Sequence, residues 1–330
     1  MRPQRGRSRP PIPIFLAFLL IACACATPAE RQHPRPRRIA FLRAVATGDA
    51  GTQEALVGEL QAGGLVEKQN LTILGADPLE AYPSPADAQR AVRTWMKDGL
   101  DLLVAFSSAG AFAARSVSSD LKIVFISIDP QAAGLVSNLR RPDRNATGVR
   151  FVPPADRTLA LAKRMFPDAR RAGLAVPRGD DAAGAHLKVL GGAAAAANLE
   201  LVTRDYSSEQ DLGSAVEALA AAGASFIVLS TSPSATRSLP ALESAAAQYR
   251  LPVVANIEQA RFAVMSLFPE SRQLGRQLGL QALRVLEGVA VRSVPVQDPQ
   301  RFTLVVNRTA AQNLGVVVPE SMLREANLVR

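Results

Sequence analysis

Two serines and an aspartate stand at the ends of two predicted neighbouring strands. Ser107 and Ser108 follow the apolar run at residues 102–106, at the point where a helix is expected to begin. Asp129 follows the next apolar run, at residues 123–126, and precedes a proline. Hydroxyls and free N–H groups at the start of a helix bind carboxylates, and a carboxylate pairs with an ammonium group. The pattern indicates either one wall of a site for a small charged ligand or ordinary helix and turn caps.

Three further polar residues occupy similar places in the second half of the chain. Arg178, Ser230 and Asn256 each follow a short apolar run. Because parallel strands end at one edge of their sheet, we expect these side chains to face the ligand from a second lobe. Arg178 is either an anion-binding residue or an ordinary surface residue. The predicted ligand-binding residues are Ser107, Ser108, Asp129, Arg178, Ser230 and Asn256.

Catalysis finds little support in the sequence. The chain has two histidines, His33 near its start and His186 in an alanine-rich segment that is expected to pack or lie at the surface. No nucleophile-elbow motif, Walker-type phosphate loop, dinucleotide fingerprint or cluster of metal ligands is found. We therefore expect no catalytic residue, metal or cofactor, and predict a protein that is not an enzyme. The alternative is an exported hydrolase that pairs Ser108 with His186, which requires hydrogen-bond reach between them.

The N-terminal residues have the features of an export signal. A basic segment at residues 1–7 precedes an apolar segment at 12–22, which is short for a membrane-spanning helix. Cys23 follows in a setting that resembles a bacterial lipobox, which predicts a signal peptide over residues 1–22 and a lipid on Cys23. Cleavage after an alanine is the alternative. Export predicts a location in the periplasm or at the outer cell surface, anchored to the membrane by that lipid, without a nucleic-acid partner.

Length and composition fit a large globular protein. The chain has 330 residues, 48% hydrophobic and 20% charged, enough for two lobes or one large α/β domain. Its formal charge of +9 falls to +5 when the four arginines of the leader are removed. The arginine- and proline-rich residues 23–37 are expected to form a solvated tether, with contact to anionic headgroups as the alternative. Both cysteines, Cys23 and Cys25, precede the body of the protein, so no disulfide is expected there.

Short apolar strands alternate with amphipathic helices along the rest of the chain, which predicts βαβ units. The expected strands are residues 39–45, 71–74, 102–106, 123–126, 172–176, 199–203, 226–229, 253–254, 264–267 and 303–306. The expected helices are residues 50–60, 85–97, 111–117, 154–165, 182–197, 209–221, 235–249 and 270–286. The predicted fold class is α/β, with two doubly wound parallel-sheet lobes joined by a multi-strand hinge. The first lobe is expected to contain residues 38–150 and about 256–290, and the second residues 151–255 and about 291–330.

Four segments carry a family resemblance. They are residues 64–70 (GLVEKQN), 126–136 (ISIDPQAAGLV), 141–148 (RPDRNATG) and 307–319 (NRTAAQNLGVVVP). Together they resemble the ABC-transporter substrate-binding family that includes tryptophan- and tyrosine-binding proteins, which has the periplasmic binding protein type I fold. The resemblance implies a monomeric receptor whose lobes close on a small ligand, such as an amino acid or similar polar or aromatic metabolite, and deliver it to an ABC permease in the inner membrane. By position, Ser108 and Asp129 inherit the binding-loop roles of the family.

Two positions depart from the family pattern. The family often has a hydroxyl residue or glycine just before the aspartate, where this chain has Ile128, and commonly a tyrosine-containing segment near residues 267–269, where this chain has none. A more apolar, differently shaped pocket is expected, so an aromatic amino acid does not carry over as the ligand. A receptor that works with a sensor-kinase ectodomain is the main alternative. A LacI-type regulator would need a DNA-binding domain where the export signal stands.

Overall fold

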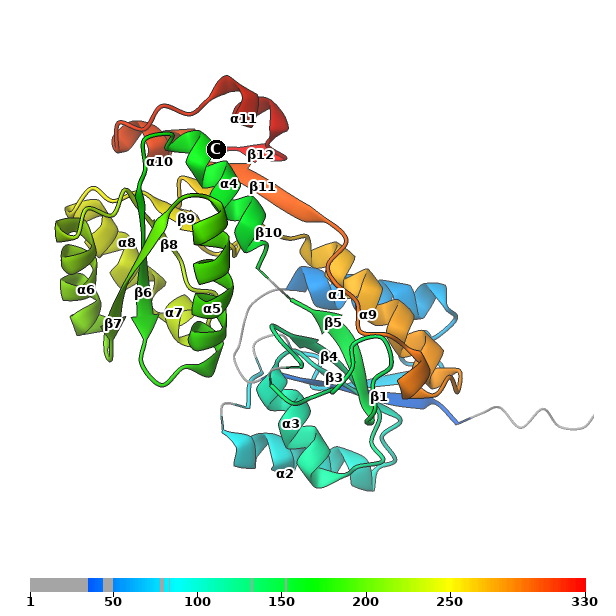
Figure 1. Ribbon diagram of the computed structural model, residues 1–330. Helices are drawn as coiled ribbons and strands as arrows, with labels where there is room; N and C mark the ends of the chain where they lie inside the picture. The colour runs from blue at the N-terminus through cyan, green and yellow to red at the C-terminus, as the bar shows by residue number, and fades with distance from the viewer. Residues whose placement is uncertain (1–34, 44–49, 78–79, 83, 132, 152) are drawn as a thin grey trace, which may run out of the picture. The chain divides into compact units, whose positions relative to one another are not determined.

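The apolar runs of the sequence form two β-sheets, each with helices on both faces (Figure 1). The computed structural model describes residues 35–43, 50–77, 80–82, 84–131, 133–151 and 153–330. The expected signal peptide, the lipid on Cys23, His33 and most of the tether lie outside the described residues. Residues 36–330 form one compact unit that contains both sheets.

The first sheet is parallel throughout, in the order β2-β1-β3-β4-β5. Its strands lack polar alternation because both faces are covered, as in β1, where Phe41 packs on one face and Leu42 on the other and both are fully buried. The strands of this sheet are β1 (Arg37–Leu42), β2 (Leu71–Leu74), β3 (Leu102–Ala105), β4 (Ile123–Ser127) and β5 (Ala146–Arg150).

Helices α1 and α9 cover one face of the first sheet, and α2 and α3 cover the other. The contact between α1 and α9 is very close: a Cβ atom added to Gly275 of α9 would lie 2.1 Å from the carbonyl oxygen of Thr52 in α1. The elements around this sheet are α1 (Ala50–Ala62), α2 (Pro85–Lys97), α3 (Ser108–Val117), α9 (Ser271–Leu286) and the 3-10 helix η1 (Val291–Ser293).

The second sheet has the order β12-β11-β10-β9-β8-β6-β7. Its neighbouring strands are parallel except β10 and β11, which are antiparallel. The strands are β6 (Arg171–Pro177), β7 (Glu200–Tyr206), β8 (Phe226–Val228), β9 (Val253–Ala255), β10 (Met265–Pro269), β11 (Phe302–Val306) and β12 (Leu328–Val329).

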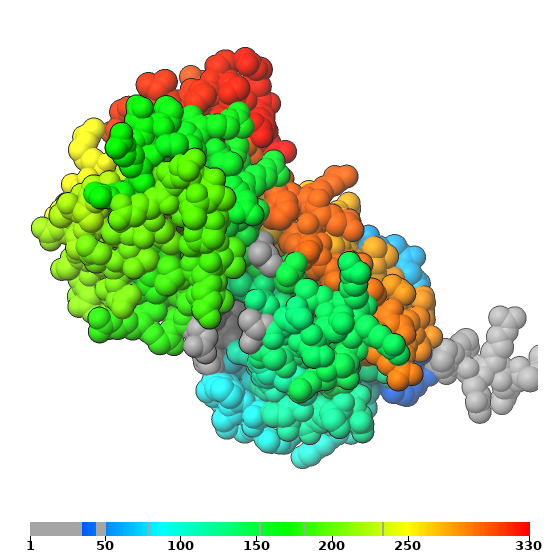
Figure 2. Space-filling view, in the orientation of Figure 1, coloured from blue at the N-terminus to red at the C-terminus, as the bar shows by residue number. Residues whose placement is uncertain are grey.

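Helices α4 and α5 cover one face of the second sheet, and α6, α7 and α8 cover the other. The C-terminal helix α11 lies beside α4, where Arg164 pairs with Glu325 at 2.7 Å (Figure 1, Figure 2). The helices around this sheet are α4 (Ala155–Met165), α5 (Asp181–Ala196), α6 (Glu209–Ala221), α7 (Pro233–Arg237), α8 (Leu239–Gln248), α10 (Arg308–Asn313) and α11 (Glu320–Glu325).

The single helix expected at residues 235–249 is two helices, α7 and α8. They meet at Ser238, and Pro240 falls in the first turn of α8. A proline has no backbone N–H to donate, which costs nothing in a first turn and breaks a helix that tries to continue through it. The proline therefore sets the start of a new helix.

The strand β10 corrects the expected domain boundaries. Residues 256–290 were expected in the first lobe, but Met265 of β10 pairs with Val254 of β9 and with Val306 of β11, all in the second sheet. The assignment was wrong for this strand because strand pairing, which depends on distant residues, decides its sheet.

The segment after α9 is a second correction. Residues 291–330 were expected in the second lobe, but Gln297 forms a parallel bridge with Val149 of β5, and Val291 and Val294 lie in the core of the first sheet. The last passage of the chain from the first sheet to the second therefore lies between residue 298 and β11.

The strand β5 was not among the expected strands. It pairs in parallel with β4, and Gly148 lies so close to it that an added Cβ would be 2.0 Å from the carbonyl oxygen of Phe125. With β5 in place, the described chain passes between the two sheets three times, after β5, after β10 and before β11. The predicted α/β class, with two mainly parallel sheets, is confirmed.

Candidate ligand-binding site

The strands β3 and β4 bring Ser107, Ser108 and Asp129 to one edge of the first sheet. The two strands are parallel neighbours, so their carboxyl ends lie side by side. Ser107 is the N-cap of α3, and its side chain accepts a hydrogen bond from the N–H of Gly110 at 3.1 Å. The capping role that the sequence left open is thus present for Ser107, and it places the first turn of α3 at this edge.

Ser108 is joined to the neighbouring strand by its hydroxyl. Its Oγ lies 2.7 Å from the Oγ of Ser127, the last residue of β4. Ser127 is only 2% exposed, whereas Ser108 is half-buried. Ser127 was not among the predicted site residues, although its position two residues before Asp129 was a signal that it shares the same edge.

Asp129 is a half-buried residue whose carboxylate caps a turn and acts on a nearby arginine. Its Oδ1 accepts a hydrogen bond from the N–H of Gln131 at 3.1 Å, which is the turn-capping role expected before Pro130. Its charge also acts on Arg150 in β5: the pKa of Arg150 is raised mainly by a hydrogen bond to Asp298, with a smaller contribution from Asp129. The carboxylate therefore stands at the first-sheet edge next to a cation.

Arg43 occupies the same edge and was not predicted. It follows β1, is 2% exposed, and its guanidinium carbon lies 4.5 Å from the ring centre of Phe106. Its Nη1 donates to the carbonyl oxygen of Gly75 at 3.0 Å. Burial lowers its pKa, and the charges of Asp77 and Glu80 oppose that shift. The sequence signal that could have identified Arg43 was a single arginine directly after the apolar run of β1. Its contacts hold the loop after β2 and the ring of Phe106, which precedes Ser107.

The second sheet places its predicted residues in three different environments. Arg178 follows β6 at the surface, with its side chain 69% exposed and 3.6 Å from the carboxylate of Asp205. Ser230 follows β8 and is 2% exposed, and its Oγ has no hydrogen-bond partner among the described residues. The surface role left open for Arg178 is therefore the one its contacts show, and Ser230 is a buried polar group.

Asn256 lies inside the lobe. It is 0% exposed, and its Nδ2 donates to the Oγ1 of Thr158 at 2.7 Å and to the carbonyl oxygen of Leu267 at 2.9 Å. These bonds tie the end of β9 to α4 and β10. The amide nitrogen thus holds the lobe together instead of facing a ligand. Only the Oδ1, for which the described part of the chain provides no hydrogen-bond partner, is left for the predicted role.

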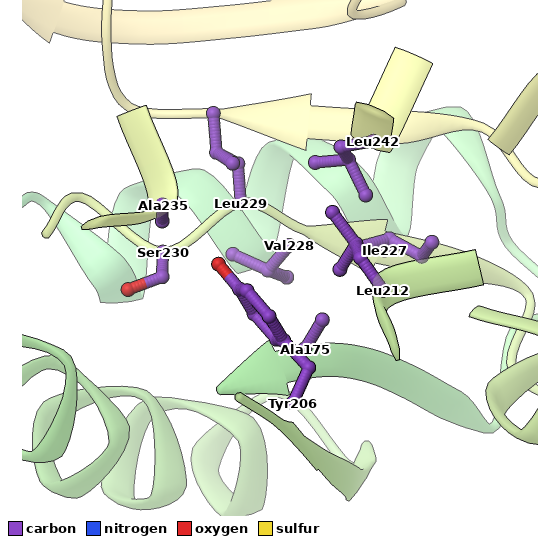
Figure 3. A pocket seen from close by; sticks show the side chains of 9 residues that line it. All are labelled: Ala175, Tyr206, Leu212, Ile227, Val228, Leu229, Ser230, Ala235 and Leu242. Carbon is purple, nitrogen blue, oxygen red and sulfur yellow. The ribbon is translucent and has the colours of Figure 1, made fainter. Parts of the chain in front are cut away.

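His186 meets Thr231, the neighbour of Ser230, at the carboxyl edge of the second sheet. It extends from α5, is 1% exposed, and its Nδ1 accepts a hydrogen bond from the N–H of Thr231 at 3.3 Å. Burial lowers its pKa to about 4. Ser230 also borders a small cavity whose wall includes Tyr206 (Figure 3). The expectation of a packed histidine is met, and the polar character of its surroundings was not predicted.

These contacts remove the basis of the hydrolase alternative. The Ser108 hydroxyl bonds to Ser127 at the first sheet, and the His186 imidazole bonds to Thr231 at the second. A histidine whose pKa lies near 4 is also a weak base at neutral pH. The pair that the hydrolase requires is not formed.

The residues that the structure describes contain neither a cluster of metal ligands nor a membrane-spanning helix. In those residues no group of three His, Cys, Asp or Glu side chains gathers as a metal site would. No helix among them is long and apolar enough to cross a membrane.

Two mainly parallel sheets, each with polar residues at its carboxyl edge, define the class of two-lobed α/β binding proteins. Periplasmic binding proteins with 12–15% identity to this chain share the architecture. The family model for ABC transporter substrate binding protein matches residues 50–330, and the chain belongs to this family. Membership confirms the family resemblance and the prediction of a binding protein instead of an enzyme.

Individual relatives are similar over different shares of the chain. A tyrosine-binding protein of Clostridioides difficile is 25% identical over 67% of this chain, which spans 65% of that relative. A conserved domain protein from Vibrio cholerae has a crystal structure with a TM-score of 0.79 and 27% identity, covering 90% of this chain and 100% of that one. An ABC domain from Streptococcus pneumoniae, in complex with L-Trp, has a TM-score of 0.77 and 21% identity, covering 89% and 100%.

Proposed function

We propose that this protein is the extracytoplasmic solute-binding component of an ABC importer and that its ligand is an α-amino acid. The ligand carboxylate binds at the first turn of α3 with the Ser108 hydroxyl, and the ammonium group pairs with Asp129. The observation that carries this proposal is the placement of a helix start, a hydroxyl pair and a carboxylate on one sheet edge. A zwitterionic ligand needs hydrogen-bond donors for its carboxylate and a carboxylate for its ammonium group, and this edge provides both.

Aromatic amino acids are the first ligands to test. The relatives that support this choice are the tyrosine-binding protein and the domain in complex with L-Trp. Ile128, half-buried beside Asp129, supplies apolar surface at the same edge. Ile128 and residues 267–269 depart from the family pattern and gave reason to expect that an aromatic ligand does not carry over, but the two relatives outweigh that expectation and favour L-tyrosine and L-tryptophan over sugars.

Delivery to a permease completes the proposed role. A ligand that touches both lobes stabilises their closed arrangement by the extra contacts made there. A permease in the inner membrane then binds this closed, liganded form. The protein acts as a monomer, held in the periplasm or at the outer surface by a lipid on Cys23, which the lipobox-like sequence supports. Cys23→Ser should move the protein from the membrane fraction to the soluble fraction, and persistence at the membrane would refute the lipid anchor.

The binding site is tested by titration calorimetry of the purified protein with L-tyrosine, L-tryptophan and a panel of sugars. Asp129→Ala should weaken amino-acid binding about 30-fold or more, because the ligand ammonium loses its charge partner. The matched control is Asp120→Ala, because the exposed Asp120 precedes β4 at its amino end while Asp129 follows the same strand. Asp120→Ala should bind as the wild type does.

Two results would contradict the proposal. Unchanged affinity in Asp129→Ala, with a normal unfolding temperature, would reduce Asp129 to a turn cap. Binding of sugars in preference to every amino acid would refute the ligand class itself.

A further inference from the structure

At the carboxyl edge of the second sheet, three buried polar atoms have no hydrogen-bond partner among the residues that the structure describes. They are Nε2 of His186, Oγ of Ser230 and Oγ1 of Thr231, in side chains that are 1%, 2% and 8% exposed. We call these three residues the second-lobe polar cluster. An unpaired buried polar group costs about 1–3 kcal/mol, so three of them in consecutive and contacting residues indicate a partner that completes them.

The hydrogen bond of His186 fixes what that partner must offer. Because the N–H of Thr231 donates to Nδ1, that nitrogen carries no proton. Burial lowers the pKa of His186 to about 4, so the ring is neutral at neutral pH and its proton sits on Nε2. Nε2–H is a donor that needs an acceptor, and the two hydroxyls can each donate or accept.

The polar neighbours of the cluster are already engaged within the protein. Asp180, at the start of α5, accepts hydrogen bonds from the N–H groups of Ala183 and Ser234, both at 3.2 Å. Burial would raise the pKa of Asp180, but hydrogen bonds from Ser234, Ala183 and Ser232 outweigh it and lower the pKa. The carboxylate of Asp180 is therefore used to cap the neighbouring helix and turn, and it does not serve as a partner for the second-lobe polar cluster.

A single water in the small cavity beside Ser230 would not complete the cluster. The small cavity beside Ser230 offers about 10 Å³ to the centre of a water molecule, which is room for about one. Tyr206 and Ser230 are among its lining residues, and the others are apolar (Figure 3). His186 and Thr231 are outside that lining, so one water in this cavity serves Ser230 at most.

We propose that the second-lobe polar cluster binds an oxygen atom at the side-chain end of the ligand, with the Nε2–H of His186 as its donor. This inference rests on the proposed function, in which the first lobe binds the amino-acid end and leaves the side-chain end to the second lobe. The ligand class is then an amino acid whose side chain ends in an oxygen acceptor. Among aromatic amino acids this is tyrosine: its phenol oxygen accepts from His186, and its O–H donates to a hydroxyl of Ser230 or Thr231.

Phenylalanine provides the matched ligand because it lacks only the phenol oxygen. A site built to hydrogen-bond a hydroxyl rejects an analogue without it, since the buried polar groups of the site stay unpaired. Titration calorimetry of the purified protein should show L-tyrosine binding at least about tenfold more tightly than L-phenylalanine.

His186→Asn tests the donor. The asparagine side chain retains an oxygen that can accept from the Thr231 N–H, but it places no donor where Nε2–H stood. L-tyrosine affinity should fall about tenfold or more while L-phenylalanine affinity stays unchanged, and His186→Gln, whose amide reaches the position of Nε2, should retain most of the preference. Ser225→Ala, at the amino end of β8, is the control and should leave both affinities unchanged.

The outcomes separate this inference from the proposed function. If the wild type binds L-tryptophan but neither L-tyrosine nor L-phenylalanine, this inference is refuted and the proposed function stands; if it binds no amino acid, both are refuted. If it binds L-tyrosine and His186→Asn leaves the preference intact, or weakens both ligands equally, the amino-acid site stands and the second-lobe polar cluster is a structural or water-binding feature only. Thermal unfolding of each variant verifies that it is folded.

Discussion

At the scale of single residues, His186 links the stability of the second lobe to pH. Its pKa is lowered by burial from about 6.5 in an unfolded chain to about 4 in the fold. Between these values the unfolded chain binds the proton more tightly, so the folded state loses stability as the pH falls. Each pKa unit corresponds to about 1.4 kcal/mol, so His186 accounts for a loss of up to about 3 kcal/mol between about pH 7 and pH 4.

The measurement compares urea unfolding of the wild type and His186→Asn across that pH range. Carboxylates titrate in both proteins and cancel in the difference, so the free energy of unfolding should fall more steeply with acid in the wild type than in the variant. Parallel pH profiles would show that His186 is accessible to protons in the folded protein.

Residue types alone predicted part of the arrangement at the sheet edges. Hydroxyl and carboxylate residues after apolar runs indicated that Ser108 and Asp129 stand at strand ends, and the parallel pairing of β3 and β4 places them on one edge. The places of His186 and Arg43 at these edges were not predicted. Their importance depends on burial and on partners 32 to 45 positions away, which no local pattern reports.

At the scale of elements, the contact of α1 and α9 depends on two glycines. A Cβ at Gly275 would lie 2.1 Å from the Thr52 carbonyl oxygen, and one at Gly279 would lie 2.5 Å from the Cβ of Glu59. Gly275→Ala should therefore lower the free energy of unfolding by about 1–3 kcal/mol or more, because the helices must move apart and disturb the core beneath them. Chemical denaturation measures the change.

The matched control is Gly191→Ala in α5, where an added Cβ has no atom within 4 Å. Alanine is favoured over glycine inside a helix by up to about 1 kcal/mol, so this variant should be as stable as the wild type or more stable. Equal effects at Gly191 and Gly275 would mean that helix propensity, and not helix contact, controls both positions.

The strand that the sequence did not predict, β5, and the strand that it assigned to the wrong lobe, β10, share a physical cause. β5 contains Gly148 and ends in Arg150, a composition that favours a loop, and it becomes a strand because Gly148 lets it approach β4. β10 resembles any other short apolar run, and only its pairing with β9 and β11 assigns it to the second sheet. Local propensity identifies strands and helices, whereas long-range pairing decides where they belong.

At the scale of the whole molecule, the segment of the chain that follows β10 completes the first lobe. It is also hydrogen-bonded to β5, from which the chain first leaves that lobe. Gln281 of α9 donates to the carbonyl oxygens of Gly148 and Pro295, at 3.0 and 3.1 Å. Arg150 forms two hydrogen bonds with Asp298, at 2.7 and 2.9 Å. Two of the three connections between the sheets therefore start from one bonded unit, so they are expected to move together when the lobes rearrange.

The first lobe should consequently fold only when both of its chain segments are present. Leu274, Leu278, Ala282 and Val285 of α9 are at most 5% exposed and pack in the core of the first sheet, so residues 36–151 alone leave that face covered only by α1. A fragment of residues 36–151 should show no cooperative thermal unfolding by circular dichroism, whereas the same fragment joined by a Gly/Ser linker to residues 271–298 should unfold cooperatively. Leu278→Asp in the joined fragment should abolish that transition, because a charge would be buried without a partner. Cooperative unfolding of residues 36–151 alone would show that the returning helix covers the lobe without being needed to build it.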